Sequence, residues 1–290
     1  MIKCNQLIQC SVYIFLFFVI SVNNAAYADD KQIEIRDIEL GKIDPNIAKI
    51  AYAGDEFLTY DVSWTGGIKI GELRLQIKAD TGCSECFEIT SVITTSGGII
   101  HALYPIEDRH VTRVKGAARL PYFCEIWQKQ GRNYEAHKVL TFDQSKYVLE
   151  KQKTGEKKVV FQLDGVVHNE FSSFFSSRVM DLQVGKPIIV PTFGDDARNE
   201  VVVVTYKEEV VEDTLLGSVN TLKVSPILTF SGLYDKKGDT VIWYTADDCR
   251  VPVRIQSKIV FGSLTATLSD FSNPYCSRYS NRQTQVATSR

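Results

Sequence analysis

The sequence LTYDVSW at residues 58–64 alternates apolar and polar side chains, and this alternation decides the fold class. Leu58, Tyr60, Val62 and Trp64 fall on one side of an extended chain, and the residues between them fall on the other. Such a pattern is typical of a strand with one buried face. We therefore predict that the chain enters a sheet at this point.

The alternation changes parity in the next segment, at Gly71-Glu72. Ile68 and Ile70 share one face before the change, and the apolar positions of residues 73–77 share the other face after it. One extra residue in a strand produces such a switch, so a β-bulge that bends the strand is predicted here.

Alternating segments with turn-rich connections continue to the end of the chain and suggest about ten to twelve strands. Connections this short permit antiparallel pairing only. The sequence therefore predicts an all-β, mostly antiparallel fold with a large curved sheet, either barrel-like, a half-barrel or a sandwich. The further segments are residues 87–93, 140–142, 159–163, 201–204, 222–230 and 251–268.

One segment, residues 169–180, has helical rather than alternating spacing. Phe171, Phe174 and Phe175 recur at helical intervals, and Asn169 is a suitable N-cap. We expect one short amphipathic helix that packs on the sheet and covers one mouth of its apolar interior. A second short helix is expected near residues 45–50.

The N-terminal segment resembles a secretory signal peptide. Lys3 precedes an apolar run at residues 12–22, and Ala26-Tyr27-Ala28 offers small residues for cleavage after Ala28. The run is about half the ~20 residues that a spanning helix needs. We predict a periplasmic, or otherwise exported, chain without a transmembrane segment after cleavage.

The chain divides, on this reading, into four parts. They are a signal peptide (1–28), an N-terminal extension (29–53), a β-rich domain (54–276) and a polar C-terminal tail (277–290). The net charge of −2 gives no electrostatic reason to expect a nucleic acid as a partner.

The most specific sequence motifs lie in the C-terminal third of the chain. Together with residues 54–64, 104–109 and 169–175, they resemble a bacterial exported family known as domain of unknown function 3108. Glu170 departs from that family, which usually has a proline at this helix start. The resemblance implies export and a β fold, and it implies no mechanism. The C-terminal motifs are YDKKG at 234–238, VIWYTADD at 241–248, RVPVRI at 250–255 and GSLTA at 262–266.

Five cysteines follow the predicted cleavage point. Cys249 precedes the last hairpin. In the expected antiparallel register, the numbers of two paired residues add up to about 523, so position 249 lies opposite position 274, near Cys276. We therefore predict a Cys249–Cys276 disulfide. Cys83 and Cys86 fall in a hairpin loop and lack the helix N-terminus of redox pairs, so they form either a structural disulfide or two unpaired thiols. The state of Cys124 stays open.

Charged residues cluster after Tyr104-Pro105. Glu107-Asp108-Arg109-His110 is either an acid/base cluster or, as we expect, a strand start in which Asp108 and Arg109 lock a turn by charge-assisted hydrogen bonds. Arg109 and Arg113 share one strand face with Lys115 and Arg119, and this row either binds a phosphate or lipid head group or lies in solvent.

No catalytic or metal-binding motif is apparent, and no cofactor is expected. We expect a non-enzymatic binding protein for an apolar or amphipathic, lipid-like ligand. The ligand-binding candidates are Phe171, Phe174, Phe175, Arg109 and Arg113. Two alternatives remain: an envelope assembly protein with a packed core, and an enzyme acting on envelope polysaccharide or lipid. A continuous apolar cavity of at least ~300 Å³ would favour the binding protein over the assembly protein. The sequence identifies no protein partner.

Overall fold

In the part of the chain that the structure describes, a single sheet of fifteen strands forms the framework. The computed structural model describes residues 38–194, 196–228, 240–259 and 262–279. The first eight strands are β1 (Glu39–Leu40), β2 (Glu56–Trp64), β3 (Ile68–Ala79), β4 (Cys86–Thr95), β5 (Ile106–Lys115), β6 (Leu120–Gln130), β7 (Tyr134–Asp143) and β8 (Val148–Lys153). The other seven are β9 (Val159–Gln162), β10 (Ile188–Gly194), β11 (Ala197–Thr214), β12 (Gly217–Leu228), β13 (Thr240–Thr245), β14 (Pro252–Ile259) and β15 (Gly262–Ser272).

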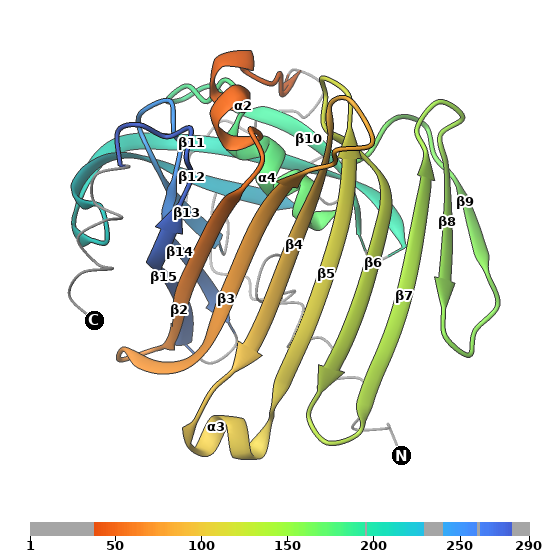
Figure 1. The fold of residues 1–290 in the computed structure, drawn as a ribbon, viewed down its shortest axis with the longest axis horizontal. Helices are drawn as coiled ribbons and strands as arrows, with labels where there is room; N and C mark the ends of the chain where they lie inside the picture. The colour runs from red at the N-terminus through yellow and green to blue at the C-terminus, as the bar shows by residue number, and fades with distance from the viewer. Residues whose placement is uncertain (1–37, 195, 229–239, 260–261, 280–290) are drawn as a thin grey trace, which may run out of the picture.

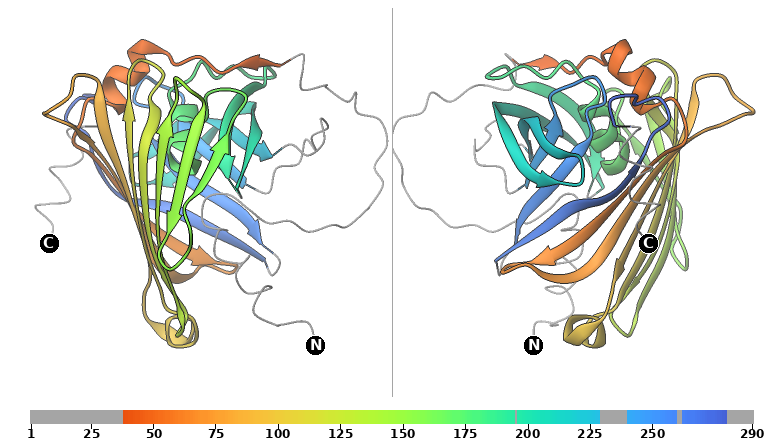
Figure 2. Two further views of the ribbon diagram at one scale, coloured as in Figure 1. Left: turned by 90° about the vertical axis from the view of Figure 1, so that its right-hand side faces the viewer. Right: turned by 60° about the vertical axis from the view of Figure 1, so that its left-hand side comes forward.

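The strand order is β1-β10-β11-β12-β13-β14-β15-β2-β3-β4-β5-β6-β7-β8-β9. Neighbouring strands pair antiparallel except β1 and β10, which are parallel. The sheet curves strongly, so that β2–β9 form one wall and β10–β15 lie across from it (Figures 1 and 2). The predicted all-β, mostly antiparallel curved sheet is thus confirmed, and its continuity excludes a sandwich among the described residues. The count of ten to twelve strands was too low.

A β-bulge bends β3 at the predicted place. Val62 pairs with Gly71 and Ser63 pairs with Lys69, so Ile70 has no partner in β2. Gly71 is required here because a Cβ at this position would lie 2.3 Å from the carbonyl oxygen of Thr94. The extra residue accounts for the change of parity in the sequence.

Three helices accompany the sheet in the described residues: α2 (Pro45–Ala51), α3 (Gly98–Leu103) and α4 (Glu170–Arg178). α4 lies inside the curve of the sheet (Figure 2). Asn169 caps it, because its side chain accepts from the backbone N–H of Ser172 while the Ser172 hydroxyl accepts from the N–H of Asn169. Every residue from 171 to 178 is buried, so α4 is enclosed on all sides. α3 was not predicted.

The apolar interior contains two clusters. The larger packs α4 and α2 against β2–β5 and β10–β15, and it includes Tyr60, Leu75 and Tyr244. The smaller joins β6–β8 to β10 and consists of Cys124, Leu140, Phe142, Leu149, Val167 and Phe193.

The β9 end of the sheet meets β10 at the smaller cluster. The rings of Phe161 on β9 and Phe193 on β10 lie 5.1 Å apart, and His168 pairs with Thr192. Side chains therefore close the half-barrel at this end, although β9 and β10 do not pair as strands.

Residues on both sides of the predicted β-rich domain also pack with its body. Ile47, Ala48, Ala51 and Tyr52 of the predicted N-terminal extension belong to the main core, as does Tyr279. No helix in the described part of the chain is long and apolar enough to cross a membrane. The predicted signal peptide, its cleavage point at Ala28 and the segment 234–238 lie outside the described residues.

Candidate functional site

A cavity of about 720 Å³ opens beside the N-terminus of α4. Its walls come from the inner face of β5–β8, from the first turn of α4 and from the turn between β10 and β11. The site therefore lies where the β5–β8 wall approaches the turn after β10, next to the smaller apolar cluster.

The register of the sheet positions the side chains of the β5–β8 wall. His110 on β5 pairs with Ile126 on β6, Ile126 pairs with Lys138 on β7, and Lys138 pairs with Lys153 on β8. Side chains in register on adjacent strands share one face. The inner face thus changes from a neutral imidazole, through an aliphatic residue, to two lysines near the edge of the sheet.

His110 forms part of the floor of the cavity. It is 7% exposed, its ring lies 4.5 Å from that of Phe171, and its Nδ1 has no hydrogen-bond partner among the described residues. Burial, with a smaller contribution from Lys138, lowers its pKa to about 3. The imidazole is therefore neutral at pH 7, and its free ring nitrogen is a polar group without a partner at the cavity.

Cys124 lines the same cavity but is held as a thiol. Its Sγ accepts a hydrogen bond from the Thr112 hydroxyl at 3.6 Å, and that hydroxyl accepts one from Asn169 Nδ2 at 2.7 Å. Burial raises the pKa of Cys124 to about 11. Because the thiolate is the nucleophilic form, this cysteine is unreactive at neutral pH.

Three lysines project from the β7–β8 side. Lys138 Nζ donates to Gln128 Oε1 at 3.1 Å, and Lys153 Nζ lies 2.5 Å from Glu156 Oε1. Lys151 Nζ lies 2.5 Å from both carboxylate oxygens of Asp196.

The apolar part of the wall consists of Ile126, Leu140, Phe171 and Phe193. Apolar surface and lysine charges thus occupy one cavity, which makes it amphipathic. The sequence led us to expect an apolar interior, and the cavity differs because polar residues replace apolar ones on the inner face of β5, β7 and β8.

Asp108 and Arg109 lie within β5 and do not lock a turn together, contrary to the expectation from the sequence. Asp108 is 3% exposed on the inner face, where it accepts from Gln130 Nε2 at 2.5 Å and from the backbone N–H of Lys129 at 3.1 Å. Burial raises its pKa. Arg109 points to the opposite face, because successive residues of a strand alternate.

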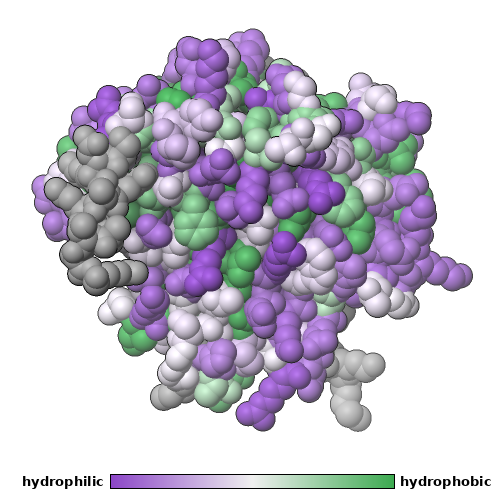
Figure 3. All heavy atoms as spheres, in the orientation of Figure 1, coloured by the Kyte–Doolittle hydropathy of each residue, from purple (hydrophilic) through white to green (hydrophobic). Residues whose placement is uncertain are grey.

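The two candidate arginines lie on the outer face of the sheet, away from the cavity. The Arg109 guanidinium lies 5.1 Å from the centre of the Trp127 ring. Arg113 forms an ion pair with Glu88 at 3.0 Å and lies 5.3 Å from the Phe123 ring. Figure 3 shows hydrophilic residues spread over the outer side of this wall, with hydrophobic residues between them.

The three candidate phenylalanines also lie in different parts of the protein. Phe171 lines the cavity, whereas Phe174 and Phe175 are 1% and 0% exposed in the main core. The last two rings contact each other edge to face at 5.2 Å, and Phe174 also contacts Tyr244. One of the five ligand-binding candidates from the sequence therefore lies at the cavity.

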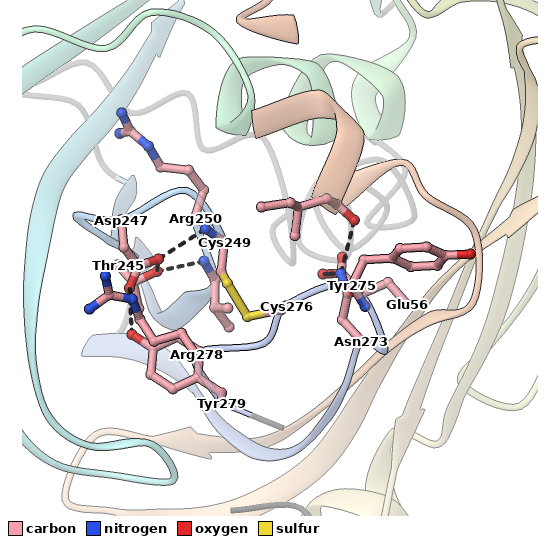
Figure 4. The surroundings of a disulfide bond; sticks show 12 residues. Glu56, Thr245, Asp247, Cys249, Arg250, Asn273, Tyr275, Cys276, Arg278 and Tyr279 are labelled. Carbon is pink, nitrogen blue, oxygen red and sulfur yellow. Dashed lines mark hydrogen bonds and ion pairs between the residues drawn. A yellow bond between two sulfur atoms is a disulfide. The ribbon is translucent and has the colours of Figure 1, made fainter. Parts of the chain in front are cut away.

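Two disulfides are present among the described residues. Cys249 and Cys276 are bonded, with 5.6 Å between their Cα atoms (Figure 4). Cys83, in the loop after β3, is bonded to Cys86, the first residue of β4. Arg254 pairs with Thr267, which shifts the last hairpin by two residues from the expected register. A turn in which the Cys276 N–H donates to the Asn273 carbonyl accompanies this bond.

The loop of the long disulfide brings Asp247, Asp248 and Cys249 close enough to suggest a metal site. However, the Cys249 sulfur is bonded to Cys276. Asp247 Oδ1 accepts from Thr245 and from the backbone of Cys249, and its Oδ2 accepts from Tyr279 at 2.6 Å (Figure 4). Asp247 and Cys249 are therefore engaged within the protein, and this three-residue group carries no metal assignment.

Comparison with known proteins identifies a family and a fold. The family model described as "Protein of unknown function (DUF3108)" matches residues 59–269. No curated protein matches. A β-barrel-like protein of domain of unknown function DUF1849 from Brucella abortus is 10% identical, with a TM-score of 0.51, over 76% of this chain and 98% of that one.

A second solved structure is less similar to this chain. A putative exported protein with a YmcC-like fold from Bacteroides fragilis is 11% identical, with a TM-score of 0.32, over 76% of this chain and 96% of that one. At such identities the first similarity shows a shared fold and nothing more.

Proposed function

This chain belongs to the DUF3108 family of proteins of unknown function, and we propose that it is an exported, non-enzymatic binding protein for an amphipathic, lipid-like ligand. The observation that carries the proposal is the cavity at the N-terminus of α4. Its volume of about 720 Å³ falls within the range of about 300–1,000 Å³ that is typical of small-molecule sites.

The chemistry of the walls supports an amphipathic ligand. An alkyl or ring portion would contact Ile126, Leu140 and Phe171, and a polar portion would face the lysines. The unpartnered Nδ1 of His110 adds a second argument, because a buried polar atom without a hydrogen bond costs about 1–3 kcal/mol. A ligand that offers a hydrogen-bonding group there would offset this cost.

The protonation states favour binding over catalysis. A general base works best with a pKa near the operating pH, and that of His110 is lowered to about 3. The Cys124 thiol is held in its protonated form. Neither residue is therefore suited to acid/base or nucleophilic chemistry at neutral pH.

Export is supported by the two disulfides together with the predicted signal peptide. Disulfides persist in oxidising compartments and are rare in the reducing cytosol. An assembly protein without a ligand remains the alternative, and the fully packed Phe174 and Phe175 are compatible with it. The cavity favours the binding protein by its volume, although its lining is amphipathic and not continuously apolar.

A fluorescence titration with the neutral dye Nile red tests the proposal. We expect saturable binding with one dye per chain. Ile126→Trp should weaken it, because the larger indole ring projects into the apolar part of the cavity. Val210→Trp is the matched control, since it adds the same ring at a position 58% exposed on β11. No saturable binding by the wild-type protein, or equal binding by Ile126→Trp, would contradict the proposal.

A further inference from the structure

One ion pair joins the two sides of the cavity. Lys151 belongs to β8, and Asp196 belongs to the turn that connects β10 to β11. Both residues line the cavity, and the Lys151 ammonium lies 2.5 Å from each oxygen of the Asp196 carboxylate. A carboxylate that belongs to the protein thus already occupies the space in front of this lysine.

The two partners are held very differently. The Lys151 side chain is 19% exposed and extends from a strand in the wall of the cavity, whereas that of Asp196 is 54% exposed. Asp196 also adopts a left-handed backbone conformation, with φ of 61°, in a turn. Turns are more mobile than the strands they connect. The lysine is therefore the fixed partner, and the aspartate is the one that can exchange.

The neighbouring ion pair repeats this asymmetry. Lys153 is on the same strand and its side chain is 32% exposed, whereas its partner Glu156 lies in the following turn and is 54% exposed. In both pairs the cation is the inner member and the anion is the outer one. An anion that enters the cavity meets ammonium groups whose present partners are free to turn into solvent.

We infer that the ligand carries one anionic head group, a carboxylate or a phosphate monoester, which displaces Asp196 from Lys151 while the apolar tail lies against Leu140, Ile126 and Phe171. This inference rests on the proposed function. Asp196 is then an internal competitor for the head-group position. A neutral head group gains nothing from the exchange, because it cannot replace the charge–charge contact that Lys151 makes with Asp196.

Displacement of Nile red by amphiphiles with equal tails tests the head-group preference. We expect decanoate or decyl phosphate to displace the dye at a concentration about fivefold or more below that of decanol, which corresponds to about 1 kcal/mol. Whichever of the two anions is the stronger competitor identifies the head-group class. Inorganic phosphate alone should not displace the dye. Displacement by inorganic phosphate would indicate a site for a free anion and would overturn the inference.

Two substitutions should change the affinity for decanoate in opposite directions. Lys151→Gln removes the cation and should weaken binding about fivefold, and Asp196→Asn removes the competitor and should strengthen it by a similar factor. Asparagine tolerates the left-handed backbone, so the second variant keeps the turn. A gain of affinity cannot arise from misfolding, which makes Asp196→Asn the decisive variant.

Matched controls lie nearby but outside the cavity. Lys158→Gln removes a lysine paired with Glu150, and Asp164→Asn removes a carboxylate paired with Arg198. Neither should alter the affinity for decanoate. If Lys151→Gln and Asp196→Asn shift the affinity in the same direction, the ion pair only holds the two sides of the cavity together and the inference is wrong. If Nile red binds but decanoate and decanol displace it equally, the inference fails while the proposed function stands.

Discussion

Arg178 of α4 and Glu56 at the start of β2 form a doubly hydrogen-bonded ion pair whose side chains are 0% and 1% exposed. The Nη1–Oε2 and Nη2–Oε1 distances are 2.5 Å and 2.8 Å. Arg178 also donates to the carbonyl oxygens of Cys249 and Arg250, and Asn273 donates to Glu56. The inner helix is therefore fixed both to the sheet and to the two chain segments that the long disulfide joins.

Removal of one partner from this pair should destabilise the protein strongly. Arg178→Met leaves the Glu56 carboxylate buried without its cation, and we expect a loss of about 3–5 kcal/mol in the free energy of unfolding. The double variant with Glu56→Gln should lose less than the sum of the two single variants, because no uncompensated charge remains. Urea denaturation of all four proteins measures this, and additive losses would show that the pair is not coupled.

The three phenylalanines of α4 should respond differently to truncation. Phe174→Ala should cost about 3–5 kcal/mol, since the ring is enclosed in the main core and leaves a void. Phe171→Ala should cost less because that side chain already borders a cavity, and it should alter the binding of Nile red. Equal losses of stability would contradict the placement of Phe171 at the cavity.

Acid should weaken the fold through two buried histidines. Burial lowers the pKa of His110 from 6.5 to about 3 and that of His168 to about 4. The unfolded chain binds a proton on each histidine near pH 6.5, whereas the folded protein does so only at lower pH. The stability that the two neutral histidines contribute is fully present above pH 6.5. It is lost as the pH falls toward their pKa values in the folded protein.

Each histidine should contribute a slope of up to about 1.4 kcal/mol per pH unit in this window. His168→Gln should therefore lose less stability than the wild type between pH 7 and pH 5, as measured by urea denaturation at both values. His101→Gln, at an exposed position, is the control. An unchanged slope in His168→Gln would mean that His168 is protonated in the folded protein.

The cysteines should divide into two bonded pairs and one thiol. Peptide mapping without reduction should find Cys249 bonded to Cys276 and Cys83 bonded to Cys86. Cys124, which is 2% exposed and has a raised pKa, should react with thiol reagents only after unfolding. Loss of the long disulfide should cost about 3–4 kcal/mol in the chain-entropy model. A Cys124–Cys276 peptide would contradict this arrangement.

If the chain is exported as proposed, its mature form should begin at Asp29. Signal peptidase prefers the small residues that Ala26 and Ala28 provide, so N-terminal sequencing of the exported protein should start after Ala28. A membrane-bound species that retains Met1 would remove the main support for export.

Local sequence patterns predict the elements of this fold well. The parity change at Gly71-Glu72 locates the bulge in β3, and Asn169 with the spaced phenylalanines locates α4. These features depend on neighbouring residues alone, because a bulge and a helix cap involve only a few consecutive positions.

The cavity is not predictable in the same way. It depends on the approach of β8 to the turn after β10, and alternation says nothing about which strands face each other across a half-barrel. One signal was available. His110, Lys138 and Lys153 fall on the inner parity of their strands, where apolar residues are the rule, and a polar residue at such a position indicates either strain or a site.

The pairing of β2 with β15 has a consequence for the order of events during folding. These strands lie side by side in the middle of the sheet, yet about two hundred positions separate partners such as Val62 and Ala266. A chain that emerges N-terminus first, from a ribosome or through a membrane channel, must therefore wait for its last strand before the two walls can join. Contacts so distant along the chain make folding slow. Until then β2 has an unpaired edge. Such an edge is prone to aggregation, which a chaperone would prevent.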